Sequence, residues 1–512
     1  MGPDTMSRTR DESGVESIEL RVRVSDWTQL TAHLFPGDHD EHGAVLLCGL
    51  ASSGTATRLL VREVALAQDG TDYVPGTRGY RHLNGEFVTH QLRRAKELGL
   101  VYLAVHNHGG SGRVSFSGQD QKSHERAYPT LLSVSGKPVG ALVLAKGASA
   151  GVLWAAGNEV RPINVTTVIG DKLEFIDDGA TREVRPRAHH EFARQALVFG
   201  DAGQRRLADL RIGVVGAGGV GMLVIQALAR LGVGNFVVID PDIVSPSNLS
   251  RLPEARRRDA YGRFGPGLVG RLAARLGLNK PALKVALASR IVDNANSASR
   301  VEAIAGDVAD DAVARRILDC DFIFLAADTM LARDVVNQIA YQYSIPSLQI
   351  GSKVVIDKTS GDIRDIFGVV RSIGSEPGCL RCNGLIDAGR LAAESLADPV
   401  QRENQRYVDE PGIEAPSVIT LNAMAVGWAV NDFMQYAVGI GRPRAGFRVL
   451  RSLPTAPEHP QLVVQTPHVD MDCHVCGHND YSVLARGDDA DLPTRIDPKR
   501  ALEPNPVPAR CS

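Results

Sequence analysis

Two histidines close an apolar run in the first third of the chain. Residues 100–108 read LVYLAVHNH and predict a strand that ends at His106 and His108. Because side chains alternate along a strand, residues i and i+2 share a face, and both imidazoles can reach one metal ion. Asp120, in the downstream Ser117-x-x-Asp motif, offers an oxygen ligand. Three protein ligands with a fourth position left open are typical of a catalytic zinc site.

A hydrolytic zinc site also needs a carboxylate that takes up and returns the proton of the metal-bound water. Glu41, just before the apolar run 43–51, is the candidate base. Each part also has a plain structural interpretation. Ser117 and Asp120 could form only a helix N-cap, and two nearby histidines are often surface residues.

A glycine-rich turn, Gly216-Ala-Gly-Gly-Val-Gly221, follows a second apolar run and opens a predicted helix. Glycines let the backbone approach a phosphate, and a helix N-terminus offers free N–H groups and a favourable dipole. Asp240, at the end of the next predicted strand, is placed to bond a ribose hydroxyl. These features alone would favour an NAD-dependent enzyme.

Charged residues downstream favour ATP over NAD. Arg251 and Lys284 could bind the β- and γ-phosphates and stabilise charge as pyrophosphate leaves. Asp328, which ends a predicted central strand, could hold Mg²⁺. Arg194, ahead of the first strand, could place a further guanidinium on the phosphates. A dehydrogenase needs none of these groups, whereas an adenylating enzyme needs all of them.

Four of the seven cysteines form two CxxC pairs, Cys379 with Cys382 and Cys473 with Cys476. Two such pairs are typical of a closed, structural Cys₄ zinc site. Disulfides are not expected in so large a chain without an export signal. Cys320 opens an apolar run and is expected in the core. A thioester at Cys320, or at Cys511 near the end of the chain, stays open.

The elements that must position these residues differ between the two halves. Short β-like runs with a few helical stretches predict an α+β fold in the first half. From about residue 189, βαβ alternation predicts a doubly wound, mostly parallel sheet with ligands at the carboxyl ends of its strands. We expect a disordered leader at 1–19, a first domain at 20–160, a connector at 161–188, a second domain at 189–481 and a flexible tail at 482–512.

Composition excludes some classes of function. The net charge of -2 argues against a nucleic-acid-binding protein. The first twenty residues lack the apolar core of a signal peptide, and no run reaches the ~18 apolar residues of a membrane span. We therefore expect a cytoplasmic protein that binds neither nucleic acid nor membrane.

Residues 189–480 resemble the ThiF/MoeB and ubiquitin-activating superfamily of adenylyltransferases. The resemblance implies a Rossmann-like domain that uses ATP and Mg²⁺ and carries the Cys₄ zinc site. It also implies that Arg194 reaches into the site of a partner subunit in a homodimer. The family's nucleotide-binding residues map to Gly216, Gly218, Gly219, Gly221, Asp240, Asn248, Arg251, Lys284 and Asp328.

Residues 20–160 resemble the JAMM (MPN or JAB) zinc metallopeptidases, which act on ubiquitin-like proteins. The resemblance implies His106, His108 and Asp120 as zinc ligands, Glu41 as the base and Ser117 as a donor to the oxyanion. Three departures occur: Gly109 replaces a proline, and the intervals from the second histidine to the aspartate and from the base to its following glycine are each one residue longer. Asp40 and Glu86 are therefore the alternative bases.

Together the two resemblances imply one substrate for both halves. The chain would adenylate the C-terminal carboxylate of a small ubiquitin-like or sulfur-carrier protein and would also cleave extensions or conjugates of that protein. One alternative is an adenylating enzyme for a small acid or peptide in metabolite biosynthesis. Another is a binding module with a degenerate N-terminal site.

Overall fold

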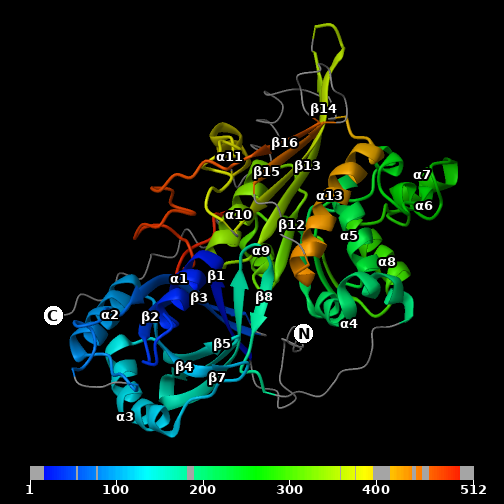
Figure 1. Ribbon diagram of the computed structural model, residues 1–512. Helices are drawn as coiled ribbons and strands as arrows, with labels where there is room; N and C mark the ends of the chain where they lie inside the picture. Colours follow the sequence, from blue (N-terminus) through cyan, green and yellow to red (C-terminus); the bar gives the residue numbers. More distant parts are fainter. Residues whose placement is uncertain are drawn as a thin grey trace.

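The computed structural model contains two eight-stranded sheets that lie side by side (Figure 1). It describes residues 17–53, 56–75, 79–180, 190–357, 359–374, 376–395, 416–440, 446–451 and 461–495. The first sheet uses residues up to 176, and the second begins at residue 211. Each sheet and the helices that pack on it form one unit, called the first and the second unit in chain order. Each unit carries one of the two sets of candidate residues.

The first sheet closes on itself. Its strand order is β1-β3-β2-β4-β5-β6-β7-β8, and β1 also pairs in parallel with β7. Strands β1 to β7 therefore form a closed ring, and β8 is added to it through an antiparallel pairing with β7. The strands are β1 (Ser17–Arg23), β2 (Gly43–Ser53), β3 (Ala56–Leu66), β4 (Val101–Ser111), β5 (Val139–Lys146), β6 (Ala148–Ala155), β7 (Glu159–Ile169) and β8 (Leu173–Ile176). The helices of this unit are α1 (Val24–Leu34), α2 (Gly85–Leu98) and α3 (Gly118–Ser135), with the 3₁₀ turn η1 (Ala156–Asn158).

The second sheet has the order β11-β10-β9-β12-β13-β14-β15-β16, parallel from β11 to β13 and antiparallel beyond. Its strands are β9 (Arg211–Val215), β10 (Asn235–Ile239), β11 (Arg300–Ile304), β12 (Phe322–Leu325), β13 (Ser347–Ile356), β14 (Ile363–Ile373), β15 (Phe447–Arg451) and β16 (Leu462–Gln465). The order reverses between β9 and β12, and ligands bind at the carboxyl ends of strands at such a reversal. The doubly wound sheet predicted from the sequence is present.

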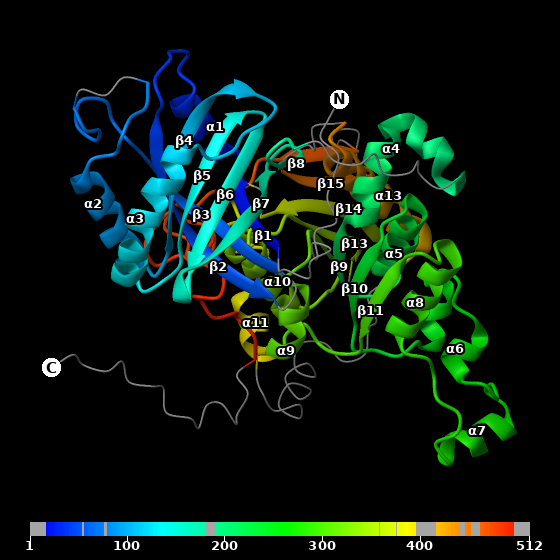
Figure 2. The ribbon, with the colours of Figure 1, turned by 90° about the horizontal axis from the view of Figure 1, so that it is seen from below.

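Helices cover both faces of the second sheet. One face carries α4 (Ala193–Asp209), α5 (Gly219–Leu231), α8 (Lys284–Ala295) and α13 (Ile419–Val438). The other carries α9 (Asp311–Ala314), α10 (Met330–Gln342) and the four cysteines of the CxxC pairs. The remaining elements are η2 (His190–Phe192), η3 (Pro246–Ser250), α6 (Arg257–Tyr261), α7 (Leu268–Arg275), η4 (Arg315–Ile317) and α11 (Ala388–Glu394). Helices α6 and α7 project from the molecule (Figure 2).

Two segments differ from the expected partition. Part of the expected connector forms β7 and β8, and Ile169, Leu173 and Phe175 enter the core of the second unit. Residues 482–495 of the expected tail pack between the units: Ser482 accepts a hydrogen bond from Arg62, and Gly487 forms a bridge to Leu50. The charged and proline-rich sequence predicted a flexible tail, but hydrogen bonds to the first unit hold residues 482–495 in place.

The expected leader extends too far, because residues 17–19 form the start of β1, while residues 1–16 lie outside the described residues. Residues 181–189 and 496–512 also lie outside them. Within the described part of the chain, no helix is long and apolar enough to cross a membrane.

Candidate functional site

The glycine-rich turn lies at the reversal point of the second sheet, between the end of β9 and the start of α5. Gly216 has φ +93°, and a Cβ there would lie 2.7 Å from the backbone nitrogen of Ala327. A Cβ at Gly221 would lie 1.8 Å from the carbonyl oxygen of Gly216. Both positions therefore require glycine. Around Gly218 the space is open, which leaves room for a phosphate against the helix N-terminus.

Asp240 follows β10 at the same edge of the sheet. One carboxylate oxygen accepts a hydrogen bond from the backbone N–H of Ala217 (2.7 Å), and the other accepts one from that of Asp242 (2.9 Å). Burial raises the pKa of Asp240, while the nearby charge of Lys284 opposes the rise. Each oxygen keeps a second lone pair, so the carboxylate can also accept from ribose hydroxyls.

Two cations stand at the turn. The Arg251 side chain passes 3.4 Å from the position of a Cβ on Gly219 and donates to the carbonyl oxygen of Ser247. Lys284 donates to Asp242 at 2.6 Å, and its Nζ lies 3.7 Å from a carboxylate oxygen of Asp240. The structure thus brings both predicted phosphate-binding cations to the glycine-rich turn.

The predicted Asn248 has a positioning role in this structure. Its side chain accepts from the backbone N–H of Ser245 at 3.2 Å, and its carbonyl accepts from that of Arg251 at 3.0 Å. Asn248 is buried. Asn248 therefore holds the 3₁₀ turn that carries Arg251 towards the glycine-rich turn.

Asp328 and Arg194 occupy different surroundings. Asp328 is exposed three residues beyond β12, at the same sheet edge as the glycine-rich turn. Arg194 is exposed at the start of α4, while the neighbouring Gln195 bonds the carbonyl of Leu231. No contact seen in the described residues joins Arg194 to the glycine-rich turn of its own chain.

One side chain at this site gave no signal in the sequence. The amide nitrogen of Asn422, from α13, lies 2.6 Å from the position of a Cβ on Gly219. Its amide oxygen accepts from Ser352 at 2.7 Å, and its nitrogen donates to Ser417 at 3.2 Å. Asn422 is far from the motif in sequence, so only the packing of α13 on α5 reveals it.

In the first unit, β4 and α3 bring the predicted ligands together. The Nε2 atoms of His106 and His108 lie 3.2 Å apart, and each lies 3.4–3.5 Å from a carboxylate oxygen of Asp120. In a tetrahedral zinc site with bonds of about 2.0–2.1 Å, ligand atoms lie roughly 3.3 Å apart. The three side chains therefore fit a zinc ion without rearrangement.

Glu41 and Ser117 flank this cluster. A carboxylate oxygen of Glu41 lies 3.8 Å from Nε2 of His108, and burial raises the pKa of Glu41 against the opposing effect of the two histidines. Ser117 is the N-cap of α3, and its hydroxyl donates to Asp120 at 2.7 Å. The helix N-cap that the Ser117-x-x-Asp motif also predicted is thus present, and it orients the Asp120 carboxylate towards the histidines.

Asn107, between the two histidines, ties the cluster to the segment that carries Glu41. Its side chain accepts from the backbone N–H of His42 at 2.6 Å, and its own N–H donates to the His42 carbonyl at 3.3 Å. Tyr80 lies close enough for the charges of Asp120 and Glu41 to raise its pKa, although burial contributes more. The sequence gave no signal for Tyr80.

The four cysteines of the CxxC pairs lie close together in the hydrophobic core that α10 also enters. The Sγ atom of Cys379 lies 3.6 Å from that of Cys382 and 3.7 Å from that of Cys473. The Sγ atoms of Cys382 and Cys476 are 3.5 Å apart. A disulfide would need about 2.05 Å. A tetrahedral zinc with bonds of about 2.3 Å places sulfurs roughly 3.8 Å apart, so the donor set fits zinc.

The lone cysteines offer no reactive thiol in the described residues. Cys320 is fully buried in the second core, and burial raises its pKa. A thiolate nucleophile needs the opposite shift. Cys511 lies outside the described residues.

A family model matches residues 192–461, described as the ThiF family, which is more than half of the chain. The chain belongs to the ThiF family. Its glycine-rich turn, Asp240, Arg251, Lys284 and Asp328 all lie within the matched residues. The match does not reach the first unit, so the interpretation of the histidine cluster rests on its geometry and on its motif.

ThiF relatives share different lengths of the chain. The sulfur carrier protein ThiS adenylyltransferase of Bacillus subtilis is 32% identical over 237 residues, 46% of this chain and 58% of that protein. The molybdopterin-synthase adenylyltransferase of Escherichia coli is 26% identical over 288 residues, 56% of this chain and 95% of that protein. The chain thus covers less than two thirds of the first relative.

Solved structures also match. The crystal structure of Escherichia coli MccB with MccA-N7isoASN is 18% identical, covers 57% of this chain and 76% of that chain, and has a TM-score of 0.42.

Proposed function

We propose that the ThiF unit adenylates the C-terminal carboxylate of a small ubiquitin-like or sulfur-carrier protein, using ATP and releasing pyrophosphate. The observation that best supports this proposal is that the glycine-rich turn, Asp240, Arg251 and Lys284 lie together where the strand order of the second sheet reverses. A relative named as the sulfur carrier protein ThiS adenylyltransferase supports the choice of substrate.

In the proposed reaction, a carboxylate oxygen of the carrier attacks the α-phosphorus of ATP. The bond from that phosphorus to the bridging oxygen breaks, and pyrophosphate leaves with the electron pair. The N-terminus of α5 and Arg251 hold the phosphates, and Lys284 turns from Asp242 towards the leaving group. Asp328 would hold Mg²⁺, which neutralises phosphate charge. Asp240 orients the ribose.

Intact-mass spectrometry tests this reaction. The full chain is incubated with ATP, Mg²⁺ and a sulfur-carrier protein that ends in Gly-Gly, and the carrier should gain the mass of one adenylyl group. The same carrier without its two final glycines is the matched control and should gain none. Adenylation of small acids or peptides, with none of the intact carrier, would contradict the proposed substrate.

We further propose that the first unit, at about residues 20–160, is a zinc peptidase that processes the same carrier protein or its conjugates. His106, His108 and Asp120 would hold the zinc, which supplies an activated water and polarises the scissile carbonyl. Glu41, partly buried beside the histidines, would accept a proton from the attacking water and return it to the leaving amine. Ser117 would donate to the oxyanion once its hydroxyl turns away from Asp120, to which it donates in this structure.

Zinc content tests the two metal sites separately. We expect two zinc ions per chain in the purified protein, one in the His106→Ala/His108→Ala variant and one in the Cys379→Ser variant. The histidine variant should keep its fold, because these imidazoles are partly exposed. A single zinc that is lost only with Cys379 would contradict a metal site in the first unit.

We also infer a homodimer through the ThiF unit, at about residues 189–481. Arg194 is exposed and makes no contact with its own glycine-rich turn within the described structure, and Leu197 and Val198 on the same helix are 87% and 65% exposed. An apolar helix face that carries an arginine suits a subunit interface. Sedimentation equilibrium should give twice the chain mass, and a monomer at micromolar concentration would contradict the inference.

A further inference from the structure

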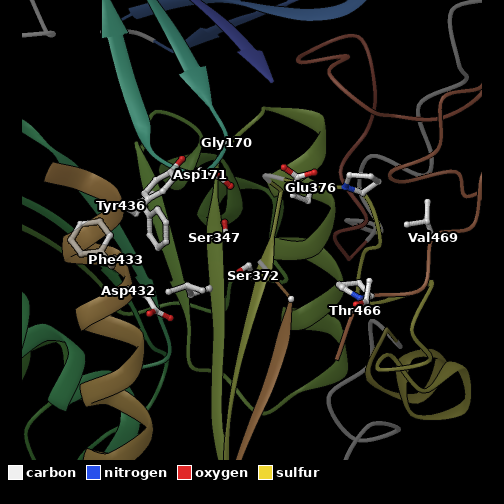
Figure 3. Close-up of a pocket in the computed structure, with 15 residues that line it drawn as sticks. Gly170, Asp171, Ser347, Ser372, Glu376, Asp432, Phe433, Tyr436, Thr466 and Val469 are labelled. Atoms are coloured by element: carbon white, nitrogen blue, oxygen red, sulfur yellow. The ribbon is translucent and has the colours of Figure 1, made fainter. Parts of the chain in front are cut away.

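A cavity of about 310 Å³ lies between the two units, away from both candidate sites. It is lined by Phe322 and Ser347, the first residues of β12 and β13, so it opens at the amino ends of the parallel strands. The glycine-rich turn lies at their carboxyl ends. The turn between β7 and β8, with Gly170 and Asp171, covers one side (Figure 3). The volume is at the lower end of the range of small-molecule sites.

Aromatic and aliphatic side chains form most of the wall. The Phe322 ring lies 4.9 Å from that of Phe433 and 5.8 Å from that of Tyr436, between ring centroids. Leu348 and Val469 add aliphatic surface. Such a wall favours an apolar body, and aromatic rings also attract a cation placed over their faces.

One buried polar group in this wall has no partner. The Tyr436 side chain is 4% exposed, and its hydroxyl makes no hydrogen bond within the described structure. Figure 3 shows the hydroxyl directed towards the turn at Gly170 and Asp171. Buried hydroxyls almost always have a partner, so this one is available to a bound molecule.

The charge of the cavity is negative. Its lining includes Asp171, Glu376 and Asp432 and no lysine, arginine or histidine. Asp432 is neutralised by the buried Arg448, whereas neither Asp171 nor Glu376 has an ion-pair partner among the residues that the structure describes. Burial and the charge of Asp171 raise the pKa of Glu376, and the charge of Arg23, which is paired with Asp26, opposes the rise. The carboxylates of Asp171 and Glu376 therefore lie close enough to influence each other.

We propose that this cavity binds a small amine with an apolar body. The body lies against Phe322, Phe433 and Leu348, and the ammonium group lies near Asp171 and Glu376, within reach of the Tyr436 hydroxyl. Neither the adenylation site nor the histidine cluster contributes to this site. A bound amine would contact both units at once, because Asp171 belongs to the first and Tyr436 to the second.

Calorimetric titration of the full chain at pH 7 with 2-phenylethylamine tests the proposal. The neutral 2-phenylethanol and the anionic 3-phenylpropanoate have similar bodies and differ in charge. We expect saturable binding of the amine and an affinity at least about tenfold lower for the alcohol, with the anion weaker still, since two carboxylates at the rim of the cavity act on the charge. Equal affinities, or no saturable binding of the amine, would overturn the proposal.

Substitutions of the lining residues test whether the amine binds in this cavity. Asp171→Asn/Glu376→Gln should weaken amine binding about tenfold and leave alcohol binding unchanged. The matched control, Glu97→Gln/Asp362→Asn, removes two exposed charges elsewhere and should change neither. Tyr436→Phe, which removes only an unpartnered hydroxyl, should fold and bind the amine more weakly. Unchanged amine affinity in both test variants would overturn the assignment.

Discussion

Ser117 and Asp120 show how one pair of residues serves structure and chemistry together. At the start of α3 the Ser117 hydroxyl accepts from the Asp120 backbone N–H, and the Asp120 carboxylate accepts from the Ser117 backbone N–H, so the pair forms a capping box. The same contacts aim the carboxylate at His106 and His108. At this scale the helix-cap and metal-ligand interpretations of the motif are compatible, because a carboxylate has lone pairs for both.

Asn107 is predicted to position the cluster without touching the metal. Asn107→Ala removes the acceptor for the His42 backbone N–H and frees the strand next to Glu41. Partners of this kind typically alter metal affinity about 10- to 100-fold, so we expect that loss in a chelator competition assay. The measurement follows the zinc held by the first unit.

Two controls accompany this prediction. Asn107→Asp keeps an acceptor oxygen and should restore most of the zinc affinity. The zinc at the four cysteines should remain in both variants, since it lies in the other unit. Loss of zinc from both sites of Asn107→Ala would indicate general unfolding, and unchanged affinity would show that the contact with His42 does not position the cluster.

At the element scale, α5 can begin where it does only because its first turn carries glycines. Gly221→Ala would place a Cβ 1.8 Å from the Gly216 carbonyl, so we expect a loss of about 3 kcal/mol or more in the free energy of unfolding. Gly218→Ala meets nothing within 4 Å. It should keep stability within about 1 kcal/mol but weaken ATP binding by filling the space above the turn.

Thermal unfolding and nucleotide binding, measured on both variants, separate the two roles. A stable Gly221→Ala protein would contradict the packing of α5 against the turn. Full ATP affinity in Gly218→Ala would contradict a phosphate at that position.

Elements with a strong repeating pattern could be predicted from the sequence. The strands β9, β10 and β12 and the helix α5 lie where the apolar runs and the glycine-rich turn predicted them. The contribution of Asn422 could not be predicted, because it depends on how α13 packs on α5. Tyr80 likewise reaches the histidine cluster only through the fold.

At the scale of the whole molecule, buried arginines join the two units. Arg58, on β3, donates to the carbonyls of Leu318, Asp319 and Cys320 in the second unit and pairs with Glu19 in the first. The sequence could not reveal this, since a lone arginine on a strand is normally exposed. Arg62, also on β3, holds the start of residues 482–495 in a similar way, because it donates to the Leu484 carbonyl and to the Ser482 hydroxyl.

Arg58→Ala should therefore destabilise the full chain. Removing the guanidinium takes one of two arginine partners from Glu19, which keeps Arg21, and takes the side-chain donor from three carbonyls. The loss of such buried hydrogen bonds typically costs about 1–3 kcal/mol. Urea denaturation, followed by tryptophan fluorescence, should show this loss. The exposed Arg258→Ala is the matched control, expected within about 0.5 kcal/mol. Equal stability of the two variants would contradict a tightly packed interface.

Adenylation by the ThiF unit is the central claim, and pyrophosphate exchange tests it most directly. With ATP, Mg²⁺ and a Gly-Gly-ended sulfur-carrier protein, the full chain should move labelled pyrophosphate into ATP. Asp328→Asn, at an exposed position that leaves the fold intact, should lower the exchange rate about 100-fold. No exchange with any such carrier, or an unchanged rate in the Asp328→Asn variant, would contradict the claim.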